Sequence, residues 1–281
     1  MRILTQSGAR HFCQNFSAST NTPEIEVGTY LDRFRSGKTF AEGTPEFDDL
    51  RDCLLRDSER FAFLAAANFA STYRSLQACS APWSVVGFYY TSFFAARSLL
   101  GMNGGWVDAD RRWIDVTNLT PGSIELTYRR TKHTAIPNRH GTHKAFWAVF
   151  YHAARILHPY AAAQHAYALA PVQSSTSWLI DNRNKLNYGS AAAAKLVAEF
   201  LARFDAADVP NTLPGDLKVC RNIALSLLAL VHQFRTSQGL TSDMNIGGAA
   251  TLTDAIDLLV RQSRPPEIDT YCDTTLVGFA A

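Results

Sequence analysis

The sequence lacks the patterns that most directly reveal a location or a redox role. No uninterrupted apolar run approaches the roughly 20 residues that a bilayer-spanning helix needs, and no apolar stretch follows basic residues at the N-terminus. The five cysteines are widely scattered and form no Cys-x-x-Cys pair, so neither a zinc site nor a redox couple is indicated. We therefore expect a cytoplasmic protein with reduced thiols and no membrane association.

Signatures of common enzyme classes are missing too. The chain has no phosphate-binding Gly loop ending in Lys-Ser/Thr, no His-Glu-x-x-His and no Gly-x-Ser-x-Gly. The formal net charge of +2 is too small to indicate a nucleic-acid partner by itself. Local clusters of basic residues must carry any such argument. We expect no cofactor and no metal site.

What is present describes a folded and mainly helical protein. With 281 residues, 47% of them hydrophobic and 19% charged, the chain can bury a substantial core. Thr44-Pro45 combines an N-cap with a first-turn proline and begins a long helix. Apolar periodicity and breaker residues predict helices over residues 44–78, 84–102, 143–158, 161–170, 178–189, 190–207, 217–234 and 252–261.

The second of these helices is apolar on nearly all sides, which is typical of a buried central helix. Tyr90, Phe94 and Arg97 follow one stripe along it, and Tyr89 and Phe93 follow the neighbouring stripe. Two interpretations of Arg97 stay open. It pairs with a buried carboxylate, or Arg97 or Tyr90 faces the helix at 178–189 across the bundle.

A β-hairpin is predicted between helices. Residues 113–116 and 124–128 read as two short strands about a Thr-Pro-Gly-Ser turn at 120–123. Clustered basic side chains bind nucleic-acid backbone without reading its sequence, so the basic end of the hairpin is a candidate RNA-binding patch. The alternative is a solvated basic loop. The candidate residues are Arg129, Arg130, Lys132, Arg139, His140 and His143.

Two histidines of that patch, His140 and His143, lie about one helical turn apart and would suit a metal ion. No carboxylate or cysteine completes a recognisable ligand set, so we predict no metal site here.

The most informative stretch is WLIDNRNKLNYG, residues 178–189. It predicts a helix that ends at Gly189 in the left-handed conformation. Arg183 and Asn184 lie about one turn from Asn187 and Tyr188, so a guanidinium, amides and a phenol share one face. The alternative is a structural helix in which Arg183 pairs with Asp181 or another acid.

The run from Arg183 to Tyr188, RNKLNY, resembles the signature of the HEPN superfamily. These are small helical bundles in which an Arg, often followed by Asn, precedes a His by a little more than one helical turn. The aromatic, Ala-rich segment 84–104 resembles the helix that precedes this signature in many members. Tyr188 stands where the family has its His.

The resemblance implies a metal-independent ribonuclease, usually a dimer whose two signatures meet in one cleft. Arg183 would hold the phosphate, because its planar fork binds two oxygens at once, and Asn184 or Asn187 would orient a hydroxyl. Tyr188 is a poor proton acceptor at neutral pH, because a phenol has a pKa near about 10. His140, His143 or His152 would then have to supply the missing base.

The sequence therefore predicts a mainly α, HEPN-like helical bundle with an inserted β-hairpin. Residues 1–43 form an N-terminal extension, residues 44–210 the bundle, and residues 211–281 further helices packed on it. Two functions are carried forward. One is an RNA-binding homodimer, able to cleave RNA, from a bacterial toxin–antitoxin or antiviral defence system. The other is a catalytically inactive subunit for assembly, partner binding or nucleotide sensing.

Overall fold

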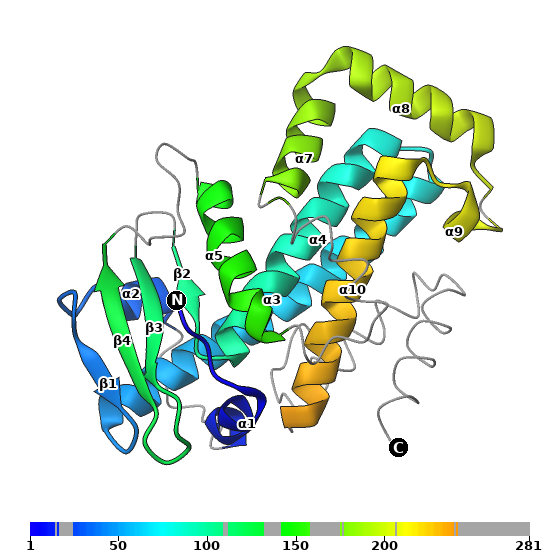
Figure 1. Cartoon of the computed structure of the whole chain (residues 1–281). Coiled ribbons are helices and arrows are strands. Elements are labelled where there is room, and N and C mark those ends of the chain that lie inside the picture. The colour runs from blue at the N-terminus through cyan, green and yellow to red at the C-terminus, as the bar shows by residue number, and fades with distance from the viewer. Residues whose placement is uncertain are drawn as a thin grey trace.

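The computed structural model describes residues 1–14, 16, 25–108, 112–131, 142–157, 175, 177–205, 207–238 and 240. The protein is mainly helical with one small antiparallel sheet, which confirms the predicted fold class (Figure 1). The helices are α1 Gln6–Gln14, α2 Val27–Leu31, α3 Pro45–Gln77, α4 Ala81–Met102, α5 Thr142–Leu157, α7 Trp178–Tyr188, α8 Ser190–Arg203, α9 Val209–Thr212 and α10 Gly215–Gln238. The strands are β1 Thr39–Ala41, β2 Trp106–Val107, β3 Arg112–Asn118 and β4 Glu125–Arg130.

Some predictions lie outside the described residues. These are the helices at 161–170 and 252–261 and the candidate RNA-binding residues Lys132, Arg139 and His140.

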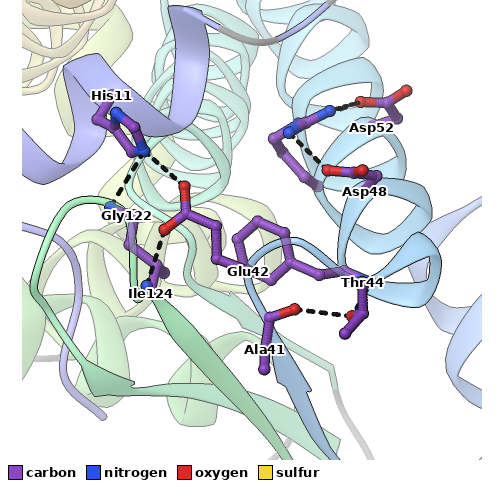
Figure 2. Close-up of polar contacts among 10 residues, drawn as sticks. His11, Ala41, Glu42, Thr44, Asp48, Asp52, Gly122 and Ile124 are labelled. Atoms are coloured by element: carbon purple, nitrogen blue, oxygen red, sulfur yellow. Dashed lines mark hydrogen bonds and ion pairs between the residues drawn. The ribbon is translucent and has the colours of Figure 1, made fainter.

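The long helix α3 begins where its sequence signals predict. The Thr44 hydroxyl accepts a hydrogen bond from the Phe47 backbone N–H at 3.3 Å, and Pro45 occupies the first turn. Arg51 binds Asp48 at 2.8 Å and Asp52 at 3.3 Å along the same helix, as Figure 2 shows beside the cap. Cap and ion pairs stabilise the first turns of a helix that continues to Gln77.

Helix α4 is the centre of the bundle, as its apolar sequence predicts. It packs along α3 and α10, with the sheet at its C-terminal end and α7 and α8 at its N-terminal end (Figure 1). Ser58 donates to the carbonyl of Ser98 at 2.8 Å, which satisfies a buried hydroxyl between α3 and α4. Gly87 faces Thr72 so closely that any Cβ there would collide, so the two helices approach at this glycine.

The sheet has the strand order β1-β4-β3-β2, all antiparallel. The central hairpin β3–β4 is the predicted one; the edge strands β1 and β2 were not predicted, because each is only a few residues long. Figure 2 shows how α1 is tied to the hairpin turn. The Glu42 carboxylate contacts His11 Nε2 at 2.5 Å and accepts from the Ile124 N–H at 2.9 Å. The N-terminal extension also buries Phe12 in the common core.

Two local predictions are wrong. Gly189 has φ −105° and ψ 92°, so it is extended rather than left-handed. A side chain there would collide with the Lys185 carbonyl, which is why glycine suits this junction between α7 and α8. The sequence predicts no helix between residues 207 and 217, but α9 occupies part of that stretch. Among the helices of the described residues, none combines the length and apolarity that crossing a membrane requires.

Candidate functional site

Helix α7, which carries Arg183 and Asn184, is held against α4 by its own apolar side. Leu179, Ile180 and Leu186 are buried, and Trp178 packs against the same core. The polar residues of α7 consequently project from the remaining faces, and Arg183 is the one that reaches α4.

Arg183 is held by neutral groups. Its guanidinium lies over the ring of Tyr89 on α4, with 4.7 Å between the Cζ atom and the ring centroid. Its Nε and Nη2 atoms donate to Asn184 Oδ1 at 3.2 Å and 2.9 Å. Within the described residues it has no carboxylate partner. Asp181, the expected alternative, instead pairs with Lys144 at 3.5 Å.

His143, in the first turn of α5, meets the same tyrosine. Its Nδ1 atom lies 2.7 Å from the Tyr89 hydroxyl, and the Trp147 indole N–H donates to that hydroxyl at 3.4 Å. The His143 ring also packs on Phe93, with 4.7 Å between centroids. Tyr89 therefore joins Arg183 of α7 to His143 of α5.

The electrostatics of the cluster keep both Tyr89 and His143 uncharged at neutral pH. Burial lowers the pKa of His143, and the nearby cations Arg183 and Arg97 lower it further. Burial raises the pKa of Tyr89 to about 12. Arg183 is thus the charged member of a cluster whose other polar groups are neutral.

The hydrogen bond between Tyr89 and His143 can run in either direction, because a neutral imidazole carries its proton on one nitrogen only. The phenol oxygen has two lone pairs and can accept from both the Trp147 N–H and the His143 Nδ1–H. In that arrangement Nε2 of His143 is a free proton acceptor. In the opposite arrangement Nε2 carries the proton and donates.

Two residues of the predicted catalytic set do not join this cluster. Tyr188 is 84% exposed, and Asn187 is exposed too. Within the part of the chain that the structure describes, neither side chain makes a hydrogen bond or a ring contact. Arg183 and Asn184 are brought together with each other, but not with the phenol that the sequence places beside them.

The described residues of the predicted RNA-binding patch have different surroundings. Arg129 is partly buried and Arg130 is exposed on β4. His143 belongs to the Tyr89 cluster instead. On the adjacent strand β3, Arg112 binds Asp32 at 2.6 Å and also pairs with Asp108, so its charge is neutralised locally.

One interpretation of the sequence expected Arg97 to pair with a buried carboxylate, and the described residues do not bear this out. Its guanidinium lies over the ring of Phe61 at 4.6 Å and that of Phe93 at 5.5 Å, and the described residues include no ion-pair partner for it. The tyrosine that contacts Arg183 is Tyr89, not Tyr90. Sequence reasoning missed Tyr89 because two adjacent stripes of aromatic residues are equally good candidates until the crossing of α7 over α4 is known.

Within the described residues, no group of three or more His, Cys, Asp or Glu side chains is placed to hold a metal ion. Comparisons with known proteins return no significant match to a family model, a curated protein or a solved structure. The function must therefore be argued from the geometry of the site.

Proposed function

We propose that this chain is a HEPN-like RNA-binding protein whose site at Arg183, Asn184, Tyr89 and His143 cleaves RNA without a metal ion, in a bacterial toxin–antitoxin or antiviral defence system. One observation carries the proposal. Arg183 is bound by a ring and an amide rather than by a carboxylate, and it lies in the same cluster as a neutral histidine.

RNA cleavage without a metal ion needs a cation at the phosphate and a base at the 2′-hydroxyl. A guanidinium without a carboxylate partner keeps its charge for the oxygens of a phosphodiester, which it can bind in pairs. His143 Nε2 accepts the proton of a ribose 2′-hydroxyl, and the 2′ oxygen then attacks the adjacent phosphorus. The bond from phosphorus to the 5′ oxygen breaks, and that oxygen takes the proton back from His143. The products are a 2′,3′-cyclic phosphate and a 5′-hydroxyl.

In this scheme His143 takes the place of the histidine that the signature lacks. Tyr89 holds the Nδ1 side of the ring and thereby leaves Nε2 for the substrate, so it is a positioning residue. Asn184 orients the Arg183 fork through its two hydrogen bonds. The partly buried Arg129 and the exposed Arg130 extend the contact with RNA backbone from β4.

The test is incubation of the purified protein with mixed single-stranded and transfer RNA in excess chelator. We expect wild type to cleave, Arg183→Ala to bind RNA about 10- to 100-fold more weakly, and His143→Asn to bind RNA but cleave about 10²- to 10⁴-fold more slowly. Tyr188→Phe should cleave like wild type, because its hydroxyl lies outside the cluster. A properly folded wild-type protein that neither binds nor cleaves RNA would overturn the proposal.

A second function is favoured by the exposure of large side chains on α7 and α8. Tyr188 is 84% exposed and Leu201 is 64% exposed, and exposed apolar surface is typical of interaction sites. On this hypothesis the chain is a catalytically inactive subunit that assembles through α7 and α8, as a homodimer or with a partner protein. Sedimentation of wild type and the Tyr188→Ser, Leu201→Ser double variant tests it. Equal masses for the two proteins, both monomeric, would argue against self-assembly.

A further inference from the structure

Helix α4 is buried except along one side. Apart from Pro82 in its first turn, its residues that retain solvent contact are Trp83, Val86, Gly87, Tyr90, Phe94 and Arg97. With 100° per residue, these six positions fall on one stripe, which we call the α4 strip. From Trp83 to Arg97 the strip rises about 21 Å along the helix axis.

The strip carries rings at stacking distance from one another. Tyr90 and Phe94 lie 6.1 Å apart with 30° between their planes. Phe61 of α3 continues the row, 6.0 Å from Phe94 and only 13° from parallel to it. Trp83 at the other end is 68% exposed. The rings of Tyr90 and Phe94 pack against the core on one side and keep solvent contact on the other.

Each end of the row of Tyr90, Phe94 and Phe61 has a guanidinium. Arg97 lies over Phe61 at 4.6 Å. At the other end Arg183 lies over Tyr89, whose ring is 5.2 Å from that of Tyr90.

Three acids, Asp108, Asp57 and Glu26, lie near enough to Arg97 to act on it, and two of them pair with other arginines. Asp57 pairs with Arg60 at 3.2 Å, and Asp108 pairs with Arg112. A small hollow lies beside Arg97, and its lining includes Phe61, Trp106 and Phe146. The row of rings therefore runs between two cations that are held mainly by aromatic faces.

From this arrangement we infer that the α4 strip binds single-stranded RNA, with bases stacked on Tyr90 and Phe94 and backbone phosphates at Arg183 and Arg97. The inference rests on the proposed function and specifies its substrate: a strand with unpaired bases. Base stacking on an aromatic side chain tolerates any sequence, because every base has a π face. A duplex cannot use the strip, because its bases are already stacked inside the helix.

Charge complementarity favours RNA over an apolar protein segment. An apolar partner laid on the strip would remove Arg97 and Arg183 from water without supplying an anion, which is costly. A nucleic-acid strand supplies both a face for each ring and an anion for each cation.

The experiment measures the affinity of a labelled oligouridylate of about 12 nucleotides, a length within the range of single-strand sites, by fluorescence anisotropy. Tyr90→Leu and Phe94→Leu remove a ring and keep an apolar side chain. Each should weaken binding about tenfold or more. Phe94→Tyr keeps the ring and should bind within about twofold of wild type. Phe63→Leu is the matched control. Phe63 is a partly buried ring like Tyr90 and Phe94, but it lies on α3 and outside the strip.

Two further measurements make the outcome decisive. Arg97→Gln should lower the slope of log affinity against log salt concentration by the equivalent of about one phosphate contact. This measurement does not depend on whether the ring variants fold. A blunt RNA duplex of the same length should compete poorly. If Arg183→Ala weakens binding while the leucine and glutamine variants bind like wild type, the strip is not the RNA site and the proposed function stands. If Arg183→Ala also binds like wild type, both fail.

Discussion

The chain contains two Arg-Asn pairs with the same local geometry and different surroundings. Arg183 on α7 and Arg221 on α10 each donate through Nε and Nη2 to the next asparagine, at 3.2 Å and 2.9 Å in both cases. Arg221 is only 5% exposed, whereas Arg183 keeps solvent contact over Tyr89. The dipeptide sets the hydrogen bonds, and the packing of its helix decides whether a ligand can reach the charge.

A third arginine shows the structural extreme of this comparison. Arg235, also on α10, binds Glu59 of α3 at 2.5 Å, and the two side chains are 5% and 2% exposed. Two opposite charges buried together are neutral as a unit. On α10, Arg235 therefore joins two helices, whereas Arg183 on α7 has no carboxylate partner among the residues that the structure describes.

The largest expected effect tests the structural role of α10. Arg235→Ala leaves the Glu59 carboxylate buried without its cation, and we expect the free energy of unfolding to fall by about 3–5 kcal/mol. Arg183→Ala should cost less than about 1 kcal/mol, because the site is partly solvated. Denaturant unfolding of both variants measures this. Equal losses of unfolding free energy in the two variants would mean that Arg183 is as important for the fold as Arg235.

The next effect concerns RNA affinity. On the proposed function, Arg183→Ala would remove charge-assisted contacts with phosphate and should weaken RNA binding about 10- to 100-fold. Arg221→Ala removes the same side chain from a matching pair that a ligand cannot reach, so a folded variant should bind RNA like wild type. Filter binding at fixed salt compares them. Equal weakening in both would mean that the loss comes from structure rather than from contact.

Positioning by Tyr89 gives a smaller and more specific effect. Tyr89→Phe removes the hydroxyl that contacts His143 Nδ1 and leaves the ring beneath Arg183. We expect RNA binding within about threefold of wild type and cleavage about tenfold slower or more, because the tautomer of His143 is no longer selected. The pH profile of cleavage should also shift. A profile and rate identical to wild type would remove Tyr89 from the mechanism.

The titration of His143 provides the next comparison. Burial is the main reason that its pKa is lowered and Arg183 is the second, so Arg183→Ala should raise the pKa part of the way back toward 6.5. Arg221→Ala should leave it unchanged. Imidazole resonances followed by NMR against pH give both values. A His143 pKa that does not respond to Arg183→Ala would place the two groups farther apart than the cluster requires.

The smallest effect is on stability against pH. Because the folded pKa of His143 lies below the unfolded value, the unfolded state binds more protons as the pH falls through about 6.5. The contribution of His143 is complete above that pH and is lost below it. His143→Asn should therefore show a slightly flatter fall in stability between about pH 6.5 and 5 than wild type. Identical slopes would mean that His143 is solvated.

Much of the fold could be predicted from local patterns. The cap at Thr44, the apolar run of α4 and the turn at 120–123 each determine their element within a few residues of chain. The edge strands β1 and β2 could not be predicted in the same way, because a strand of two or three residues is defined by its partner rather than by its own sequence.

For the site, the sequence by itself determined that α7 carries an Arg-Asn pair on a helix with an apolar side, since both follow from residue order and helical period. Only the tertiary structure decided that Tyr188 lies exposed and that His143 and Tyr89 complete the cluster. Those residues come from helices separated by long stretches of chain. Their meeting depends on how α4, α5 and α7 pack, which is a property of the whole core rather than of any one segment.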